Sequence, residues 1–347
     1  MRYTVLMNTF SEIIGQEIVV SHLQNALRTG GVSHAYILNG AKGSGRHMIA
    51  RSFSAALLCE NPRQEGDRIE PCGECLSCIQ TAAGSNPDLI TLEREKENSI
   101  GVGDIRRMRA DVQIKPYSAE HKIYIIPDAE KMTPAAQNAL LKTLEEPPSY
   151  AVILLLADGT GSFLPTIMSR CITLPLRPVP EKAVEDCLKE RFGAKEDRAR
   201  LCARFSGGSI GRAALLLENE NFANLREKTI LLLQKIEKTN AAQLASFAKE
   251  TVTEEETRDL IDLILTWNRD LLVCRSTHST ENLIFTDEVQ YIIEAAQTTS
   301  WQGLQAAAEA VFRARRRLFS NVNADLTLQM MLLEIRAAYR MTDTRAE

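Results

Sequence analysis

The first half of the chain alternates short apolar runs with helix-forming stretches, and this alternation limits the folds that the chain can adopt. The runs that read as strands are 35–38, 88–92, 123–126, 152–156 and 172–174. Helical patterns follow them at 48–58, 102–112 and 134–146. Apolar runs of this kind, separated by helices, are typical of a parallel sheet that is covered by helices on both faces. The sequence therefore predicts an α/β domain over residues 1–177.

The second half of the chain differs in character from the first. Pro175, Pro178 and Pro180 mark a boundary, and strand-like runs disappear beyond it. Helical patterns at 181–192, 198–205 and 211–217 predict a small helical domain over 178–220. Longer helices follow, and one of them carries an apolar stripe at helical spacing, formed by Leu260, Ile264, Trp267 and Leu271. We therefore expect an all-α domain over 221–347.

Composition excludes several classes of protein. The chain has 347 residues, with 41 Lys plus Arg against 45 Asp plus Glu, and a net charge of −4. A protein that holds nucleic acid by itself usually has a basic surplus, because phosphate neutralisation supplies most of the affinity. No run approaches the roughly 18 apolar residues of a membrane span, and the N-terminal residues do not resemble a signal peptide. We expect a cytoplasmic protein without a membrane partner.

A glycine-rich loop, from Gly40 to His47, follows the first expected strand and opens a helix. The spacing of Gly40, Gly43 and Gly45 matches that of loops whose backbone amides cradle phosphate groups. The residues that perform the chemistry differ from that pattern. Arg46 stands at the position of the lysine, and its forked guanidinium does not replace an ammonium group like for like. His47 stands at the Ser/Thr position, and imidazole is a poor ligand for Mg²⁺.

The end of the third expected strand is altered as well. A nucleotide site needs a pair of acidic residues there, one for the metal and one for the attacking water. Pro127 takes the first of these positions and leaves Asp128 alone. The sequence therefore predicts a degenerate nucleotide loop that does not support ATP hydrolysis, and silent nucleotide binding stays an alternative.

Four of the cysteines are clustered, at Cys59, Cys72, Cys75 and Cys78. Disulfides are disfavoured in a reducing compartment, so close cysteine spacing there indicates a metal site. Tetrahedral Zn²⁺ takes four thiolates, and the protein would supply every ligand, which leaves no position for water. We therefore predict a structural zinc module at 59–80. The other cysteines are scattered, which is typical of small buried apolar side chains.

Several segments of the chain resemble bacterial clamp-loader AAA+ subunits. The segments are 10–17, 33–40, the inserted cysteine module, 138–148, and the motif Ser169-Arg170-Cys171. The altered loop separates the chain from the ATP-hydrolysing gamma/tau members, and the resemblance is greatest to the delta-prime members of DNA polymerase III. It implies an AAA+ domain with an inserted zinc module, a helical lid over 178–220 and an all-α collar over 221–347.

The resemblance also implies a function. It implies a non-hydrolysing stator subunit that assembles with gamma/tau and delta in a heteropentamer and helps to load the sliding clamp on primed DNA during replication. Arg170 would act in trans as an arginine finger at the site of a neighbouring ATPase subunit. The lid arginine of the ATPase members falls on Gly211 here, and their sensor threonine is replaced near Ala157 and Asp158.

Two other functions stay open at this point. One is an active AAA+ ATPase with an unusual loop, which turnover of ATP by the purified chain would reveal. The other is a zinc-containing DNA-binding regulator, which would bind DNA by itself in a salt-dependent manner. The acidic balance of the chain argues against the regulator.

Overall fold

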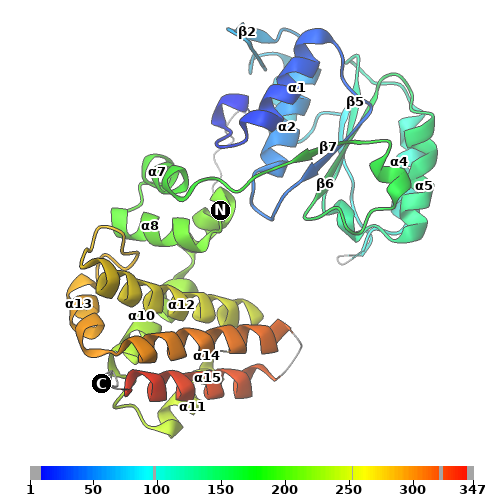
Figure 1. The fold of residues 1–347 in the computed structure, drawn as a ribbon. Helices are drawn as coiled ribbons and strands as arrows, with labels where there is room; N and C mark the ends of the chain where they lie inside the picture. The colour runs from blue at the N-terminus through cyan, green and yellow to red at the C-terminus, as the bar shows by residue number, and fades with distance from the viewer. Residues whose placement is uncertain (1–8, 97–98, 252, 320–322, 342–347) are drawn as a thin grey trace. The chain divides into compact units, whose positions relative to one another are not determined.

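The structure is a computed structural model that describes residues 9–96, 99–251, 253–319 and 323–341 (Figure 1). The chain forms two compact units. The first contains Met1–Val184 and Gly208–Arg212, and the second contains Glu185–Gly207 and Ala213–Glu347. The short segment Gly208–Arg212 thus belongs with the sheet domain, although it lies beyond the first helices of the second unit.

A parallel sheet forms the centre of the first unit. Its strands are β1 (Ala35–Asn39), β4 (Leu89–Thr91), β5 (Lys122–Ile126), β6 (Ala151–Ala157) and β7 (Ile172–Pro175), in the spatial order β4-β5-β6-β1-β7. Every neighbouring pair is parallel. The predicted parallel sheet is confirmed, and the carboxyl ends of β1, β5 and β6 lie at one edge, where the glycine loop begins.

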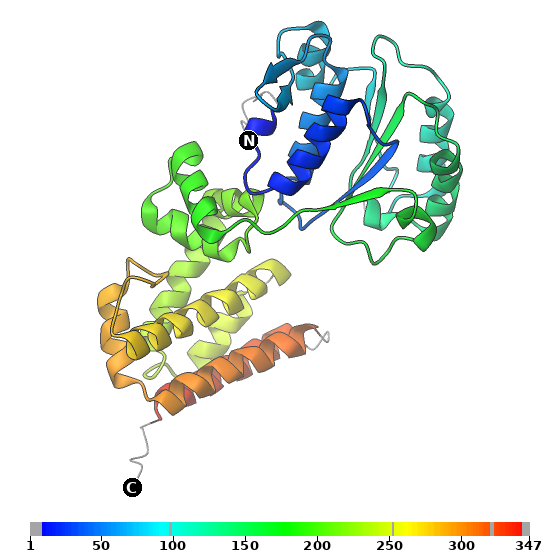
Figure 2. The same cartoon turned by 45° about the horizontal axis from the view of Figure 1, so that its top comes forward.

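Helices cover both faces of this sheet (Figures 1 and 2). One face packs on η1 (Phe10–Glu12), α1 (Glu17–Thr29) and α2 (Arg46–Leu58). The other packs on α4 (Val102–Val112), η2 (Ala129–Lys131), α5 (Pro134–Glu145) and α6 (Pro165–Met168). Alternation along β5 explains the two layers, because Tyr124 and Ile126 belong to one core whereas Ile123 and Ile125 belong to the other.

The cysteine module is an insertion between α2 and β4. It contains the hairpin of β2 (Arg63–Glu65) and β3 (Arg68–Glu70), followed by α3 (Leu76–Ala83). Hydrogen bonds of Glu70 and Gln24 help to attach it to the rest of the first unit. The buried Glu70 carboxylate accepts the backbone N–H groups of Phe10 and Ser11 at 2.9 and 3.1 Å. The Gln24 side chain of α1 exchanges two hydrogen bonds with the backbone of Ile69.

All the regular secondary structure in the described part of the second unit is helical. Its helices are α7 (Glu181–Phe192, whose first turn belongs to the first unit), α8 (Glu196–Phe205), α9 (Ile210–Glu218, which begins in the first unit), α10 (Glu220–Lys235), α11 (Ala241–Glu250), α12 (Glu254–Thr277), α13 (Val289–Thr298), α14 (Trp301–Phe319) and α15 (Ala324–Tyr339). The predicted stripe on α12 is buried, with Trp267 packed edge-on against Phe285.

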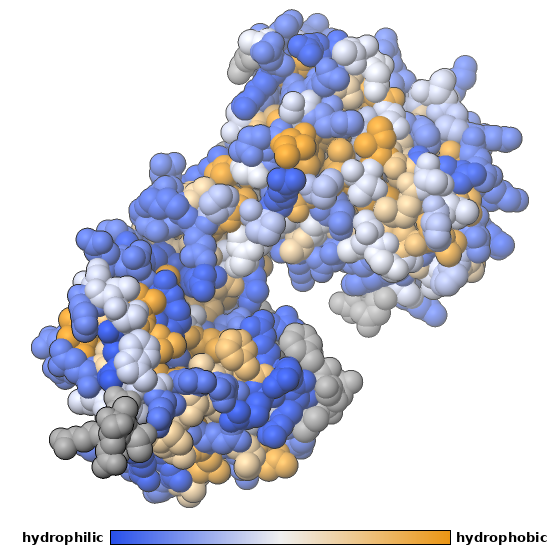
Figure 3. Space-filling view, in the orientation of Figure 1, coloured by the Kyte–Doolittle hydropathy of each residue, from blue (hydrophilic) through white to orange (hydrophobic). Residues whose placement is uncertain are grey.

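The surface drawn in Figure 3 carries hydrophilic side chains over most of its area, with smaller apolar areas between them. Within the described ranges, none of the helices combines the length and the hydropathy that crossing a membrane requires.

Candidate functional site

The glycine loop connects β1 to α2 at the carboxyl edge of the sheet. Gly40 donates its N–H to the Ala157 carbonyl at 2.9 Å, which fixes the start of the loop to the end of β6. Gly43 and Gly45 have φ angles of +81° and +97°. Residues with a Cβ rarely adopt such angles, so the loop conformation explains these two glycines. The loop thus joins a strand to a helix and contains two left-handed glycines.

The Arg46 side chain crosses the glycine loop and contacts residues on both sides of it. Its side chain is only 4% exposed, and its Nη1 donates to the Gly40 carbonyl at 3.0 Å. Its Nη2 lies 3.4 Å from Oδ1 of Asp128, beyond the end of β5. A buried guanidinium needs such partners, because an unpaired buried charge is strongly destabilising. The arginine thus takes up the carboxylate that would otherwise be available to a metal ion.

Basic side chains surround the carboxylate of Asp128. Besides Arg46 it contacts Arg94 at 3.2 Å and Lys131 at 3.4 Å. Burial pushes the pKa of Asp128 upward, but Lys131, Arg94 and Arg46 together outweigh burial and hold the pKa below its ordinary value. Asp128 also has a left-handed backbone with φ of 49°. The sequence identified Asp128 and Arg46, but it gave no signal for Arg94 or Lys131.

His47 does not restore a metal ligand of the kind that Mg²⁺ prefers. Burial, and then the charges of Arg46 and Arg51, lower the pKa of its imidazole despite the opposing charge of Asp128. The ring is therefore neutral near pH 7, and it offers nitrogen where Mg²⁺ requires oxygen.

A segment of the same unit covers the loop. Gly211 donates its N–H to the Gly43 carbonyl at 3.0 Å, and the Ser209 hydroxyl donates to the Lys42 carbonyl at 3.1 Å. A Cβ on Gly43 would lie 2.6 Å from the Ser209 oxygen and 2.8 Å from the Arg212 nitrogen. A Cβ on Gly211 would lie 2.9 Å from the Gly43 Cα. Two glycines thus allow a backbone contact in which the chain itself closes the loop.

This contact can be tested with a pair of alanine substitutions. Gly43→Ala is expected to lower the free energy of unfolding by about 2–4 kcal/mol, because it adds left-handed strain and a steric clash. Gly45→Ala is the matched control, since Gly45 also has a positive φ but nothing lies within 4 Å of its added Cβ. Urea unfolding of both variants measures the difference. Equal losses for the two would show that the loop is not closed by Ser209–Arg212.

The four predicted ligand cysteines come together. Their Sγ atoms all lie within 4.8 Å of one another, with Cys59 to Cys75 at 4.0 Å and Cys72 to Cys78 at 3.9 Å. Thiolates about 2.3 Å from one tetrahedral ion lie about 3.8 Å apart, so the spacing fits a metal ion. The backbone N–H groups of Cys72, Cys75 and Cys78 donate to sulfur atoms of the cluster at 3.3–3.4 Å.

The electrostatics of the cluster suit metal-bound sulfur. The backbone N–H groups of Glu74 and Cys75 lower the pKa of the Cys72 thiol to about 6. Burial instead raises the pKa of Cys59 and of Cys78. Thiols this close together cannot all ionise, because their negative charges would repel one another. A bound metal ion reduces this repulsion and allows all of them to be thiolates. The cluster could therefore hold a metal ion with four protein ligands.

Arg170 lies just beyond α6 and is separate from the glycine loop. Its side chain is 34% exposed, and its Nη2 forms an ion pair of 2.9 Å with Oε1 of Glu145, the last residue of α5. Its Nη1 donates to the Thr166 carbonyl at 3.0 Å. The Arg170 side chain is thus partly exposed, and Glu145 is a partner that the sequence analysis did not identify.

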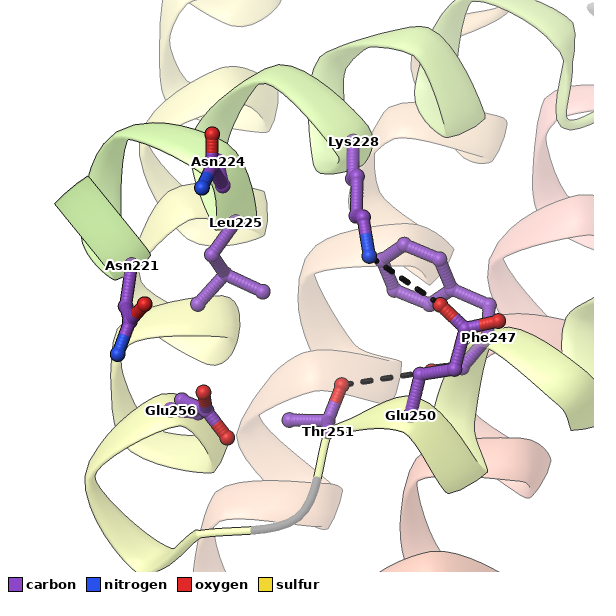
Figure 4. A pocket seen from close by; sticks show the side chains of 8 residues that line it. All are labelled: Asn221, Asn224, Leu225, Lys228, Phe247, Glu250, Thr251 and Glu256. Carbon is purple, nitrogen blue, oxygen red and sulfur yellow. Dashed lines mark hydrogen bonds and ion pairs between the residues drawn. The ribbon is translucent and has the colours of Figure 1, made fainter.

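The second unit contains a hollow of about 180 Å³ between α10, α11 and the start of α12 (Figure 4). It is lined by Asn221, Asn224, Leu225, Lys228, Phe247, Glu250, Thr251 and Glu256. Lys228 and Glu250 form an ion pair of 3.3 Å there and neutralise one another. None of the residues that the sequence predicts for a site lines this hollow.

Comparison with known proteins identifies the family. Residues 15–180 match the family described as DNA polymerase III, delta subunit, and residues 220–337 match DNA polymerase III, delta subunit, C terminal. DNA polymerase III subunit delta' of Bacillus subtilis is 31% identical over 325 residues, which are 92% of this chain and 95% of that protein.

The tau subunits match smaller shares of their own length. DNA polymerase III subunit tau of Bacillus subtilis is 29% identical over 79% of this chain and 52% of its own. The tau subunit of Escherichia coli is 35% identical over 62% of this chain and 33% of its own. A gamma subunit-related protein of Thermotoga maritima superposes with a TM-score of only 0.41 at 21% identity, over 92% of this chain and 99% of that chain. The match to subunit delta', which spans nearly the whole of both proteins, is decisive: the chain belongs to the family of DNA polymerase III delta' subunits.

Proposed function

We propose that this chain is the non-hydrolysing stator subunit of a clamp loader, which assembles with gamma/tau and delta subunits and helps to place the sliding clamp on primed DNA. Family membership supports the replication role. One observation carries the non-hydrolysing assignment: the Arg46 guanidinium joins the Gly40 carbonyl to Asp128 across the loop. The contact of Gly211 with Gly43 supports it independently.

The proposed role divides the chain into three parts. Residues 1–177 form the AAA+ domain, 178–220 the lid and 221–347 the collar through which the subunits assemble. The segment Gly208–Arg212, although part of this lid, clusters with the sheet domain. The contacts of Ser209 and Gly211 with the glycine loop therefore lie within the first unit.

The cysteine cluster is proposed to hold one structural Zn²⁺. Cys59, Cys72, Cys75 and Cys78 would be its ligands, and their sulfur spacing supports this choice. When bound, the ion would offset two of the four thiolate charges and fix α3 and the hairpin of β2 and β3 relative to α2. Because the protein fills all four positions, the ion would support the fold and take no part in a reaction.

Arg170 is proposed as an arginine finger for the neighbouring ATPase subunit. Such an arginine stabilises the charge that develops on the transferring phosphoryl group. A partly exposed guanidinium beyond α6 meets the requirement that the group be reachable from outside the chain. The chain would thus take part in ATP hydrolysis without a working nucleotide site of its own.

The isolated chain is expected to show no ATP turnover above a blank without protein. The reason is that Arg46, His47 and Pro127 stand where the lysine, the metal-binding hydroxyl and one carboxylate are needed. Steady-state phosphate release from the purified protein measures this, with Asp128→Asn as the matched variant. Turnover that Asp128→Asn abolishes would identify a working ATPase site and overturn the proposal. The replication role is tested separately, by clamp loading with complexes reconstituted with and without this chain.

A further inference from the structure

We propose that Glu145 is a positioning residue for Arg170, which holds the guanidinium in the orientation that the neighbouring ATPase site requires. This inference rests on the proposed function of Arg170 as a finger in trans. Glu145 would act only through Arg170, and in that role it would contact neither the nucleotide nor the neighbouring subunit.

The contacts of Arg170 restrain its side chain but do not use all of its N–H donors. One terminal nitrogen, Nη2, pairs with Glu145 at 2.9 Å. The other, Nη1, donates to the Thr166 carbonyl at 3.0 Å and lies 3.4 Å from the Ser169 hydroxyl. A guanidinium has five N–H donors, so this set does not exhaust it. The remaining donors, on a side chain that is 34% exposed, can face a phosphate.

Glu145 is held by a helix that is firmly anchored. It is the last residue of α5, and Leu140 and Leu144 of that helix are buried in the core beneath. Pro147 and Pro148 follow after Glu146, so the helix cannot extend. The carboxylate therefore projects from a fixed end of α5.

The position of Glu145 is unfavourable for α5 alone. The C-terminal end of a helix carries partial negative charge, so an acidic side chain in the last turn is destabilising and a basic one is preferred. Arg170 supplies the missing positive charge from another part of the chain. A residue that conflicts with its own helix and is matched by a partner elsewhere marks a role beyond helix stability.

The backbone that leads to Arg170 is fixed by a different residue of α5. The buried Gln137 side chain donates to the Ser162 carbonyl at 2.9 Å and to the Met132 carbonyl at 3.2 Å, and it accepts the Leu164 N–H at 2.8 Å. This anchors the segment immediately before α6. With the backbone held by Gln137, the freedom that remains is that of the Arg170 side chain, and Glu145 restricts it.

The ion pair is partly exposed at both ends, with Glu145 49% exposed, so it contributes little to folding. Its effect is to order a long side chain before it meets its target. An arginine side chain has many rotamers, and restricting them in advance is worth up to about thirtyfold in the rate of a step that needs one orientation. Loss of Glu145 should therefore reduce the rate without removing the finger.

The test uses intact reconstituted complexes with the other clamp-loader subunits, the clamp and primed DNA. Glu145→Ala is expected to lower kcat of the stimulated ATPase by about three- to thirtyfold, with little change in KM for ATP. Glu145→Asp, which keeps the charge, should recover part of the rate. Glu146→Ala is the matched control, because it removes the same charge one residue later, and no ion pair of Glu146 occurs in the described part of the chain.

A double variant separates positioning from a general effect on α5. In the background of Arg170→Ala, the change Glu145→Ala should cause no further loss, because the group that it orients is already gone. A further loss there, or a kcat of the single Glu145→Ala variant equal to that of Glu146→Ala, would overturn the inference. If Arg170→Ala complexes themselves keep the full rate, the finger role fails instead, and the two failures are thereby distinguished.

Discussion

Arg170→Ala is expected to reduce ATP hydrolysis at the neighbouring site that Arg170 is proposed to complete by about 10³-fold or more, which is the range that arginine fingers supply in trans. Clamp loading by the reconstituted complex should fall with it. The variant chain should remain folded and assembled, because the Arg170 side chain is partly exposed and its contacts are an ion pair and bonds to its own short helix. Stimulated phosphate release and clamp loading measure the effect.

Two controls make the result of this substitution interpretable. Intact complexes that contain the Ala variant are isolated first, so that loss of assembly is not mistaken for loss of chemistry. Arg170→Lys should recover little activity, because an ammonium is a point charge and cannot reproduce a planar, two-pronged contact with phosphate. If isolated Ala complexes hydrolyse ATP and load clamps at the unmodified rate, Arg170 is an ordinary surface residue.

Loss of the proposed zinc ion is expected to have the second large effect, on the stability of the cysteine module. Structural zinc supplies about 10–16 kcal/mol of apparent binding free energy in small zinc domains, and that energy stabilises the fold. Cys75→Ser removes one ligand, so zinc content should fall below one equivalent per chain. The hairpin of β2 and β3 and helix α3 should then lose protection from hydrogen exchange. Elemental analysis of protein purified without chelator, together with exchange over 59–83, measures both.

A cysteine outside the cluster provides the comparison for this experiment. Cys274 is buried in α12 of the other unit, so Cys274→Ser should leave zinc at one equivalent even where it costs some stability. Less than half an equivalent of zinc in the unmodified protein would contradict the metal assignment. Unchanged zinc content in Cys75→Ser would contradict the proposed ligand set.

Much of the sheet domain could be predicted because its signals are local. The runs at 123–126 and 152–156 fall within β5 and β6, since continuous apolar sequence is required wherever a strand is buried on both faces. The hairpin in the cysteine module was not predicted. Its strands, Arg63–Glu65 and Arg68–Glu70, are polar, and they are held by tertiary bonds from Gln24 and Glu70 rather than by their own pattern.

In the candidate site, the sequence could identify residues but could not show which of them are in contact. The altered loop pattern identified Arg46 and Asp128, because a phosphate loop has fixed spacing. It could not show that these two side chains pair with each other, because that pairing depends on where the end of β5 lies relative to β1. Glu145 and Arg170 are likewise distant in sequence and meet only because α5 and α6 pack on one face of the sheet.

The backbone contact between Gly43 and Gly211 also bears on how this lineage can change. The resemblance to the ATPase members places their lid arginine at position 211, yet any side chain there begins with a Cβ that would lie 2.9 Å from the Gly43 backbone. An arginine at 211 would therefore disturb the folded domain. If the loop does not support hydrolysis, as proposed, the close approach of these two glycines would hinder the return of that arginine and make the loss difficult to reverse.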